Sequence, residues 1–373
     1  MSAAALRADV EALAAMTRDS AGAGERLAAD HGARRLRDIG AADVHLQHFP
    51  FQTTFAHAQG PHFAAGAVAA LAGSRLLAGA ALASFELDYT GRSQWLRRHL
   101  PAREGTNVIG RLPATGRRSR TLVLVAHHDA ARTGLMWDPR LLRAGDRAAA
   151  KSGRRMSLAL LPELAMAATV LGGRRAGSPA ATVLAVATAL LADQARSPTV
   201  PGANDNASGV AGVLDLTARL ASDRAPGLEV VVLLCGCEES GMGGMGAWMD
   251  SEGGGLDPDS TLVLGLDTVG SGEPVVLEAE GGLWPVRYRG EDVAMAERAA
   301  AEAGAPLRRW RLGAWTDPVL ARIGGLPALS ILSVRDGGFP EYHRPGDTPE
   351  RVDYACLQTC VQAAEAIARR HAG

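Results

Sequence analysis

The chain has 373 residues, of which 47% are hydrophobic and 21% are charged. A chain of this composition can bury a sizeable core, so disorder is excluded for most of its length. The formal net charge of −1 leaves no overall electrostatic footprint for nucleic acid or anionic lipid. Three arginine pairs near glycines are interpreted as solvated loops: Arg117-Arg118, Arg154-Arg155 and Arg174-Arg175.

The N-terminal segment predicts the cellular compartment. The stretch Met1–Ala14 includes Arg7, Asp9 and Glu11, so it lacks the uninterrupted apolar run of a secretory signal. We therefore expect a cytoplasmic protein.

Short apolar runs alternate with helical patterns along the chain, which predicts an α/β fold. The expected elements, in chain order, are helices at Ala5–Ala15 and Gly24–Ile39, strands at Val44–His48, Asn107–Arg111 and Thr121–His127, a helix at Ala207–Ala221, strands at Glu229–Gly236, Thr261–Asp267 and Pro274–Ala279, a helix at Glu291–Gly304, a strand at Ala328–Ser333 and a helix at Tyr354–Arg370. The runs Leu122–Ala126 and Val230–Leu234 are apolar at every position, which is typical of strands buried on both faces.

Two apolar stretches do not fit this alternation and are interpreted as insertions, at residues 60–95 and 132–198 of a single domain covering 1–373. Phe63–Phe85 is rich in Ala and Leu, and Met156–Asp193 resembles two apolar helices joined by a polar turn. Pro162 and Glu163 interrupt the second stretch, and Arg75 is costly in the middle of a lipid-spanning helix. We expect a packed helical cap or a homo-oligomer interface, with peripheral membrane association as the alternative.

Acidic and imidazole side chains follow three of the predicted strands directly. They are His127, the pair Glu238-Glu239, and Asp267. The carboxyl ends of parallel strands line one crevice, so these groups should converge there. Buried carboxylates need a neutralising cation, and a mixture of His, Asp and Glu donors suits zinc.

The loop Pro201–Gly209 adds another carboxylate at a junction between a loop and a helix. Asp205 lies in this loop, where backbone amides could hold its carboxylate while both oxygens face metal ions. Asn206 or Ser208 is suited to cap the helix that follows.

Together these residues form five motifs in a fixed order: His127-x-Asp129, Asn204-Asp-Asn-Ala-Ser-Gly209, Glu238-Glu239, Leu266-Asp267 and Tyr342-His-Arg-Pro-Gly-Asp-Thr348. The set resembles that of the co-catalytic zinc aminopeptidases, metallopeptidase family twenty-eight, which also includes glutaminyl cyclases and glutamate carboxypeptidases. The resemblance covers the regions 107–129 and 201–370. It implies a three-layer αβα sandwich with a mixed, mostly parallel central sheet, the zinc exopeptidase fold.

The resemblance also implies two zinc ions per chain and a peptide substrate that is cleaved at its N-terminal bond. The implied metal ligands are His127 and Asp267 on one ion, Glu239 and His343 on the other, and Asp205 bridging the two. Asp129 would accept the second ring N–H of His127 and fix its tautomer. Glu238 would be the general base, and Tyr342 would hydrogen-bond the developing oxyanion.

Two positions depart from the family pattern. A second histidine, His128, occupies a position that is usually bulky or aromatic, and we expect it to point away from the metals. Thr316-Asp317-Pro318 stands where many relatives have Ser-Asp-His, which affects substrate preference. Pocket residues are expected near Met242, Met245, Trp315 and Asp317.

The sequence leaves three alternatives open. A glutaminyl cyclase would share the fold and use one zinc ion. A member of a second dinuclear peptidase family would use the same pair of metal ions, but that family places its bridging aspartate in a local sequence different from Asn204–Gly209. A non-enzymatic membrane scaffold of the same fold would suit the apolar insertions.

Overall fold

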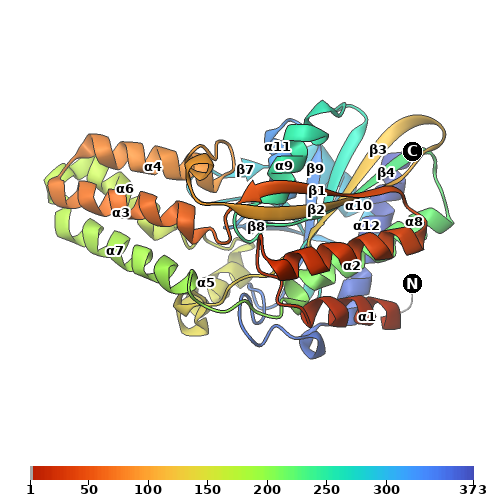
Figure 1. Ribbon diagram of the computed structural model, residues 1–373, viewed down its shortest axis with the longest axis horizontal. Helices are drawn as coiled ribbons and strands as arrows, with labels where there is room; N and C mark the ends of the chain where they lie inside the picture. Colours follow the sequence, from red (N-terminus) through yellow and green to blue (C-terminus); the bar gives the residue numbers. More distant parts are fainter. Residues whose placement is uncertain (1–2) are drawn as a thin grey trace.

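The computed structural model describes residues 3–373 and contains one mixed β-sheet covered by helices, with a helical bundle beside it (Figure 1). Within these residues the strands are β1 (Ala42–Phe51), β2 (Arg103–Leu112), β3 (Thr115–His127), β4 (Pro226–Cys235), β5 (Thr261–Leu266), β6 (Glu273–Glu280), β7 (Val286–Arg287), β8 (Arg308–Leu312) and β9 (Ala328–Val334). Their order in the sheet is β1-β2-β4-β3-β5-β9-β6-β7, and β8 pairs with β6.

The centre of the sheet is parallel. Strands β4, β3, β5 and β9 run parallel to one another, whereas β1, β2, β6 and β7 add antiparallel pairings toward the edges. In the register of β3 with β4, Leu122 lies opposite Val230 and His127 opposite Cys235. The apolar runs of both strands are buried, as predicted. The α/β class and the mixed, mostly parallel central sheet are thus confirmed.

Helices cover both faces of the sheet. The described helices are α1 (Ala3–Ala14), α2 (Ala23–Ile39), α3 (Ala56–Ala72), α4 (Arg75–Tyr89), α5 (Pro139–Ser152), α6 (Leu160–Gly172), α7 (Gly177–Gln194), α8 (Ser208–Ser222), α9 (Gly243–Ser251), α10 (Gly290–Glu302), α11 (Pro318–Ile323) and α12 (Tyr354–Ala372). α8 and α12 pack against one face, with α1, α2 and α10 beside them, and α9 and α11 lie on the other (Figure 1). This gives the three layers of the expected sandwich.

Two of the elements that the sequence pattern did not predict, β8 and α9, have atypical compositions. Strand β8 reads Arg-Arg-Trp-Arg-Leu, and only Trp310 and Leu312 are buried while arginines cover its other positions. Helix α9 contains three glycines, which lower helix propensity by about 1 kcal/mol each. Burial of Met245 and Trp248 in the core compensates for this cost.

The two apolar stretches form an antiparallel bundle of α3, α4, α6 and α7 that extends away from the sheet (Figure 1). It has a core of its own, centred on Phe63, Phe85, Met166 and Leu184. The first stretch is two helices because Gly73 turns the chain with a φ of 68°, and the Ser74 side chain accepts a hydrogen bond at the next N-terminus. Among residues 3–373, no helix is long and apolar enough to cross a membrane.

A buried carboxyl pair lies where α4 meets α6. Glu163 is fully buried, and Glu86 is nearly so. Burial, followed by repulsion from Glu86, raises the pKa of Glu163 to about 7. The carboxyl group of Glu163 is therefore neutral in the folded protein over a pH range in which the same group is ionised in the unfolded chain.

This pair predicts how stability depends on pH. The stabilisation from neutral Glu163 is complete below its ordinary pKa of 4.5 and is lost as the pH rises through about 7. Glu163→Gln is neutral at every pH, so its melting temperature should fall less than that of the unmodified protein between pH 4.5 and 8. Glu291→Gln, at an exposed position, is the control for thermal melts monitored by circular dichroism. If the melting temperatures of Glu163→Gln and of the unmodified protein change equally with pH, Glu163 does not have a raised pKa in the folded protein.

Candidate active site

The residues predicted at strand ends gather at one edge of the sheet. His127 is the last residue of β3, Glu238 and Glu239 follow β4, and Asp267 follows β5. Since β3 lies between β4 and β5 and is parallel to both, their carboxyl ends meet. All four side chains are buried or nearly so.

Asp205 lies between the two histidines of the site. It is carried by the turn Ala203–Ala207, directly before α8. Its Oδ1 atom lies 3.3 Å from His127 Nε2, and its Oδ2 atom lies 3.0 Å from His343 Nε2. His343 comes from the loop after β9, so one carboxylate joins segments far apart in the sequence.

Two groups of possible metal ligands share Asp205. One is His127, Asp205 and Asp267, the other is Asp205, Glu239 and His343, and in each the ligand atoms lie within 4.8 Å of one another. His127, Glu238 and Glu239 form a third such group. Among residues 3–373, the buried Glu239 Oε1 atom has no hydrogen-bond partner. An unpaired acceptor among buried carboxylates and imidazoles fits a divalent cation such as zinc.

The carboxyl groups perturb one another strongly. Burial, and then the negative charges of Asp205 and Glu238, raise the pKa of Glu239 well above its usual range. Burial is also the main reason that the pKa of Glu238 is raised and that of Asp267 rises to about 6. Asp205 differs: burial opposes its ionisation, but hydrogen bonds from His127 and His343 hold its pKa below the ordinary value. Positive charge at this position would stabilise the ionised carboxylates.

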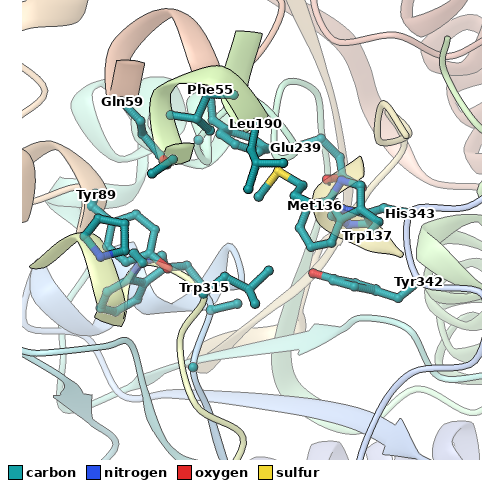
Figure 2. Close-up of a pocket in the computed structure, with 18 of the residues that line it drawn as sticks. Phe55, Gln59, Tyr89, Met136, Trp137, Leu190, Glu239, Trp315, Tyr342 and His343 are labelled. Atoms are coloured by element: carbon teal, nitrogen blue, oxygen red, sulfur yellow. Dashed lines mark ion pairs between the residues drawn. The ribbon is translucent and has the colours of Figure 1, made fainter. Parts of the chain in front are cut away.

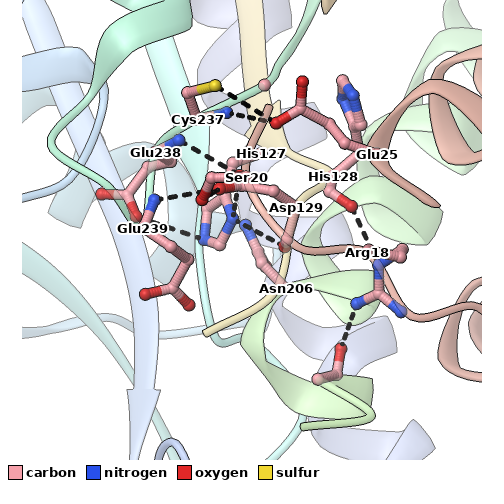
Figure 3. Close-up of polar contacts among 12 residues, drawn as sticks. Arg18, Ser20, Glu25, His127, His128, Asp129, Asn206, Cys237, Glu238 and Glu239 are labelled. Atoms are coloured by element: carbon pink, nitrogen blue, oxygen red, sulfur yellow. Dashed lines mark hydrogen bonds and ion pairs between the residues drawn. The ribbon is translucent and has the colours of Figure 1, made fainter. Parts of the chain in front are cut away.

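Asp129 orients the groups around it. Its Oδ1 atom lies 3.4 Å from His127 Nδ1, on the ring edge away from Asp205. Ser20 Oγ donates to its Oδ2 at 2.7 Å, and the backbone N–H groups of Glu238 and Glu239 donate to its carboxylate at 3.1 and 3.2 Å (Figure 3). Asp129 thus connects the end of β3 with the glutamate pair after β4.

The structure identifies two supports that sequence reasoning missed. The Asp347 carboxylate accepts the N–H groups of Asn204 and Asp205, at 2.8 and 3.0 Å. The loop amides therefore bind Asp347, and the expectation that they hold the Asp205 carboxylate was wrong. Fully buried Arg18 donates to the carbonyls of His128 and Gly202, which ties β3 to the same loop. Asp347 lies within a motif that sequence analysis recognised, whereas Arg18 has no distinguishing local signal.

Asn206 and His128 are the sequence neighbours of the candidate ligands Asp205 and His127. Asn206 Oδ1 accepts the N–H of Gly209 at 3.0 Å, so Asn206 contributes to the start of α8. His128 is buried and lies on the Arg18 side of His127, away from Glu239 (Figure 3). It is absent from the ligand groups formed by the described residues.

A cavity of about 430 Å³ separates the site from the base of the bundle. Figure 2 shows Glu239 and His343 on one side of this chamber, Phe55 and Leu190 of the bundle region on another, and Trp315 below. The walls are mainly apolar. Met242 and Trp315 line the chamber as expected, whereas Met245 and Asp317 are buried and do not.

Two further side chains in the wall are relevant to chemistry. Tyr342 stacks on His343 with ring centroids 3.8 Å apart, and its hydroxyl points into the chamber (Figure 2). Arg155 was interpreted as part of a solvated loop, but its side chain is only 11% exposed. It lies over the Tyr342 ring and pairs with Asp146, because the chain after α5 folds back against the core.

The fold and the gathered carboxylates and imidazoles define the class of zinc peptidases. The profile of Peptidase family M28 matches residues 107–368, and the chain belongs to this family. Among curated proteins, no sequence matches the chain.

Several solved structures share the fold. A Zn-dependent exopeptidase from Parabacteroides distasonis is 15% identical with a TM-score of 0.58, over 98% of this chain and 97% of the other. An aminopeptidase from Aneurinibacillus sp. strain AM-1 is 14% identical with a TM-score of 0.59, over 98% and 93%. A Bacteroides thetaiotaomicron glutaminyl cyclase bound to N-acetylhistamine is 14% identical with a TM-score of 0.57, over 98% and 97%.

The contacts of Asp129 predict its effect on metal affinity. Asp129→Asn keeps the side-chain size but removes the charge that orients His127, so zinc affinity should fall by roughly 10–100-fold. Competition with a chromophoric chelator measures the change. Asp9→Asn, a buried carboxylate that pairs with Arg35 away from the site, is the control. Unchanged zinc affinity in Asp129→Asn would show that Asp129 does not position a ligand.

Proposed function

We propose that the protein is a dinuclear zinc aminopeptidase that hydrolyses the N-terminal peptide bond of its substrate. One observation carries the proposal: Asp205 belongs to both ligand groups, and each of its oxygens faces a different histidine. His127 and Asp267 would hold one ion, and Glu239 and His343 the other, with Asp205 between them. A bridging carboxylate with a pair of donors on each side is suited to two ions about 3.5–4 Å apart.

Zinc bound here would supply Lewis acidity, which lowers the pKa of water and polarises a carbonyl. Glu238 is the proposed general base. It lines the chamber beside the ligands, with Oε2 at 3.9 Å from His127 Nε2. A carboxylate in this position can take a proton from water and transfer it to the leaving amine, a contribution of roughly 10²–10⁴-fold.

Tyr342 is the proposed hydrogen-bond donor to the oxyanion. Stacking on His343 and an edge contact with Trp137, at 5.4 Å between ring centroids, restrict its ring. A donor that is already oriented loses little free energy when charge develops on the carbonyl oxygen. Burial raises the pKa of Tyr342 well above its ordinary value, so its hydroxyl retains its proton at neutral pH.

The chamber favours a substrate with a large apolar N-terminal side chain. Its wall combines Phe55, Phe63 and Leu190 from the bundle region with Met242 and Trp315 from the core. Such a side chain gains roughly 25 cal/mol for each Å² of apolar surface that it buries. A short or charged side chain would leave the apolar wall unfilled.

A glutaminyl cyclase is the second candidate, favoured by the likeness to the Bacteroides thetaiotaomicron cyclase fold. It would use one zinc ion. The second ligand group, around Glu239 and His343, favours two ions instead.

A non-enzymatic scaffold is the third candidate. All proposed ligands and Glu238 are present, which supports an active enzyme.

Removing the proposed base should separate chemistry from metal binding. Glu238→Ala should retain two equivalents of zinc, because Glu238 is not one of the five proposed ligands. Its kcat on aminoacyl arylamides should fall by roughly 10²–10⁴-fold. Metal content by atomic emission and steady-state kinetics are the measurements, with exposed Glu350→Ala as the control. A kcat close to that of the unmodified protein would show that Glu238 is not the general base.

Filling the chamber should alter specificity. Ala187 lines it from α7, and Ala187→Trp would occupy the space for a large side chain. We expect kcat/KM for leucyl and phenylalanyl reporters to fall by roughly tenfold or more, with a smaller change for the alanyl reporter. Ala185→Trp, on the exposed face of the same helix, is the control. An equal loss on all reporters would show that the chamber does not select the substrate.

A further inference from the structure

The distal end of the helical bundle is formed by two turns that lie together. We define the bundle tip as residues 71–77, where α3 meets α4, and residues 171–175, where α6 meets α7. Gly73 packs against the Arg174 side chain, and Gly173 faces Arg75. The tip is thus one surface, at the end of the bundle away from the sheet (Figure 1).

The tip exposes large apolar side chains. Leu71 is 68% exposed, Leu76 is 86% exposed and Leu171 is 78% exposed. Along the helices behind them, Val68 and Val186 are also exposed. A surface helix in water normally has a polar outer face, and a continuous apolar one indicates a binding surface.

The charged groups of the tip are all basic. Arg75, Arg174 and Arg175 are exposed, and among residues 3–373 none of them forms an ion pair with a carboxylate. The sequence contains no Asp or Glu between Asp43 and Glu86, or between Glu163 and Asp193. Positive charge beside exposed leucines is complementary to anionic phospholipid headgroups above an acyl layer.

We propose that the bundle tip inserts into the interface of an anionic lipid bilayer. The leucines enter the boundary of the acyl chains, while the guanidinium groups remain at the level of the phosphates. Since no described helix is long and apolar enough to cross a membrane, the bundle contacts the bilayer with its end and does not cross it.

Docking by the tip has a consequence for the active site. Helix α7 has 18 residues, which corresponds to a length of about 27 Å. The chamber lies at the opposite end of the bundle, where Phe55, Phe63 and Leu190 line it. The tip therefore holds the chamber about one helix length from the lipid surface, where it meets peptides that extend from the membrane.

Vesicle co-sedimentation of the full chain tests the proposal. The unmodified protein should bind vesicles of phosphatidylglycerol and phosphatidylcholine, and bind vesicles of phosphatidylcholine alone less tightly. Leu76→Asp with Leu171→Asp should reduce binding to the anionic vesicles by at least tenfold. Leu27→Asp, at a position that is 57% exposed on α2, should bind as the unmodified protein does.

A second variant tests the electrostatic part separately. Replacing Arg75, Arg174 and Arg175 with glutamine should weaken binding to anionic vesicles by roughly fivefold for each residue. Binding to phosphatidylcholine alone should not change. All variants should retain hydrolysis of soluble aminoacyl reporters and the far-ultraviolet circular dichroism of the unmodified protein, since the tip is remote from the chamber.

Two results would overturn the proposal. One is failure of the unmodified, folded protein to bind anionic vesicles. The other is a dimer by light scattering that Leu76→Asp with Leu171→Asp converts to a monomer, without vesicle binding by either form. That outcome would assign the leucines to a contact with a second copy of the chain.

Discussion

The carboxylate of Asp205, held between two imidazoles, is the interaction on which the site depends. Its two oxygens lie 3.3 and 3.0 Å from His127 and His343, and three further carboxylates, all largely buried, surround it. Without positive charge, such a cluster would be neutralised by protonation, as the raised pKa values of Glu238 and Glu239 indicate. The geometry is compatible with ionised ligands only if cations share the space.

Much of the surrounding structure serves to hold this arrangement in place. The parallel strands β3, β4 and β5 bring three of the ligand-bearing segments to one edge of the sheet. Asp129 binds the backbone of the glutamate pair, and Asp347 binds the backbone of the Asp205 loop. Arg18 and Ser20 extend this support to the N-terminal segment, so the described chain from α1 onward contributes to the site.

The strand ends and the ligand types could be predicted from the sequence because the apolar runs of β3, β4 and β5 end directly at His127, Glu238 and Asp267. The roles assigned to these residues came from the resemblance, and the structure places the residues together without testing the roles. Arg18 and Ser20 could not be found, because nothing in their local sequence indicates a contact more than a hundred residues away. Helix α9 was not predicted because its glycines lower its helix propensity, and only the packing of the helix in the folded protein compensates for them.

The apolar stretches show what tertiary structure adds to a compositional signal. Composition alone allowed a cap, an oligomer interface or a membrane contact. The two ends of the bundle have separate environments. The base faces the chamber, and the tip exposes leucines together with arginines that form no ion pair within residues 3–373. The proposed substrate selection and the proposed attachment to a lipid surface thus lie at opposite ends of one bundle, which makes them separable by mutation.

The most direct measurement is anomalous diffraction at the zinc edge from crystals grown with zinc. We expect two peaks, one on each side of the Asp205 carboxylate, with one bounded by His127 and Asp267 and the other by Glu239 and His343. A single peak at full zinc occupancy, or peaks that do not contact Asp205, would contradict the dinuclear site.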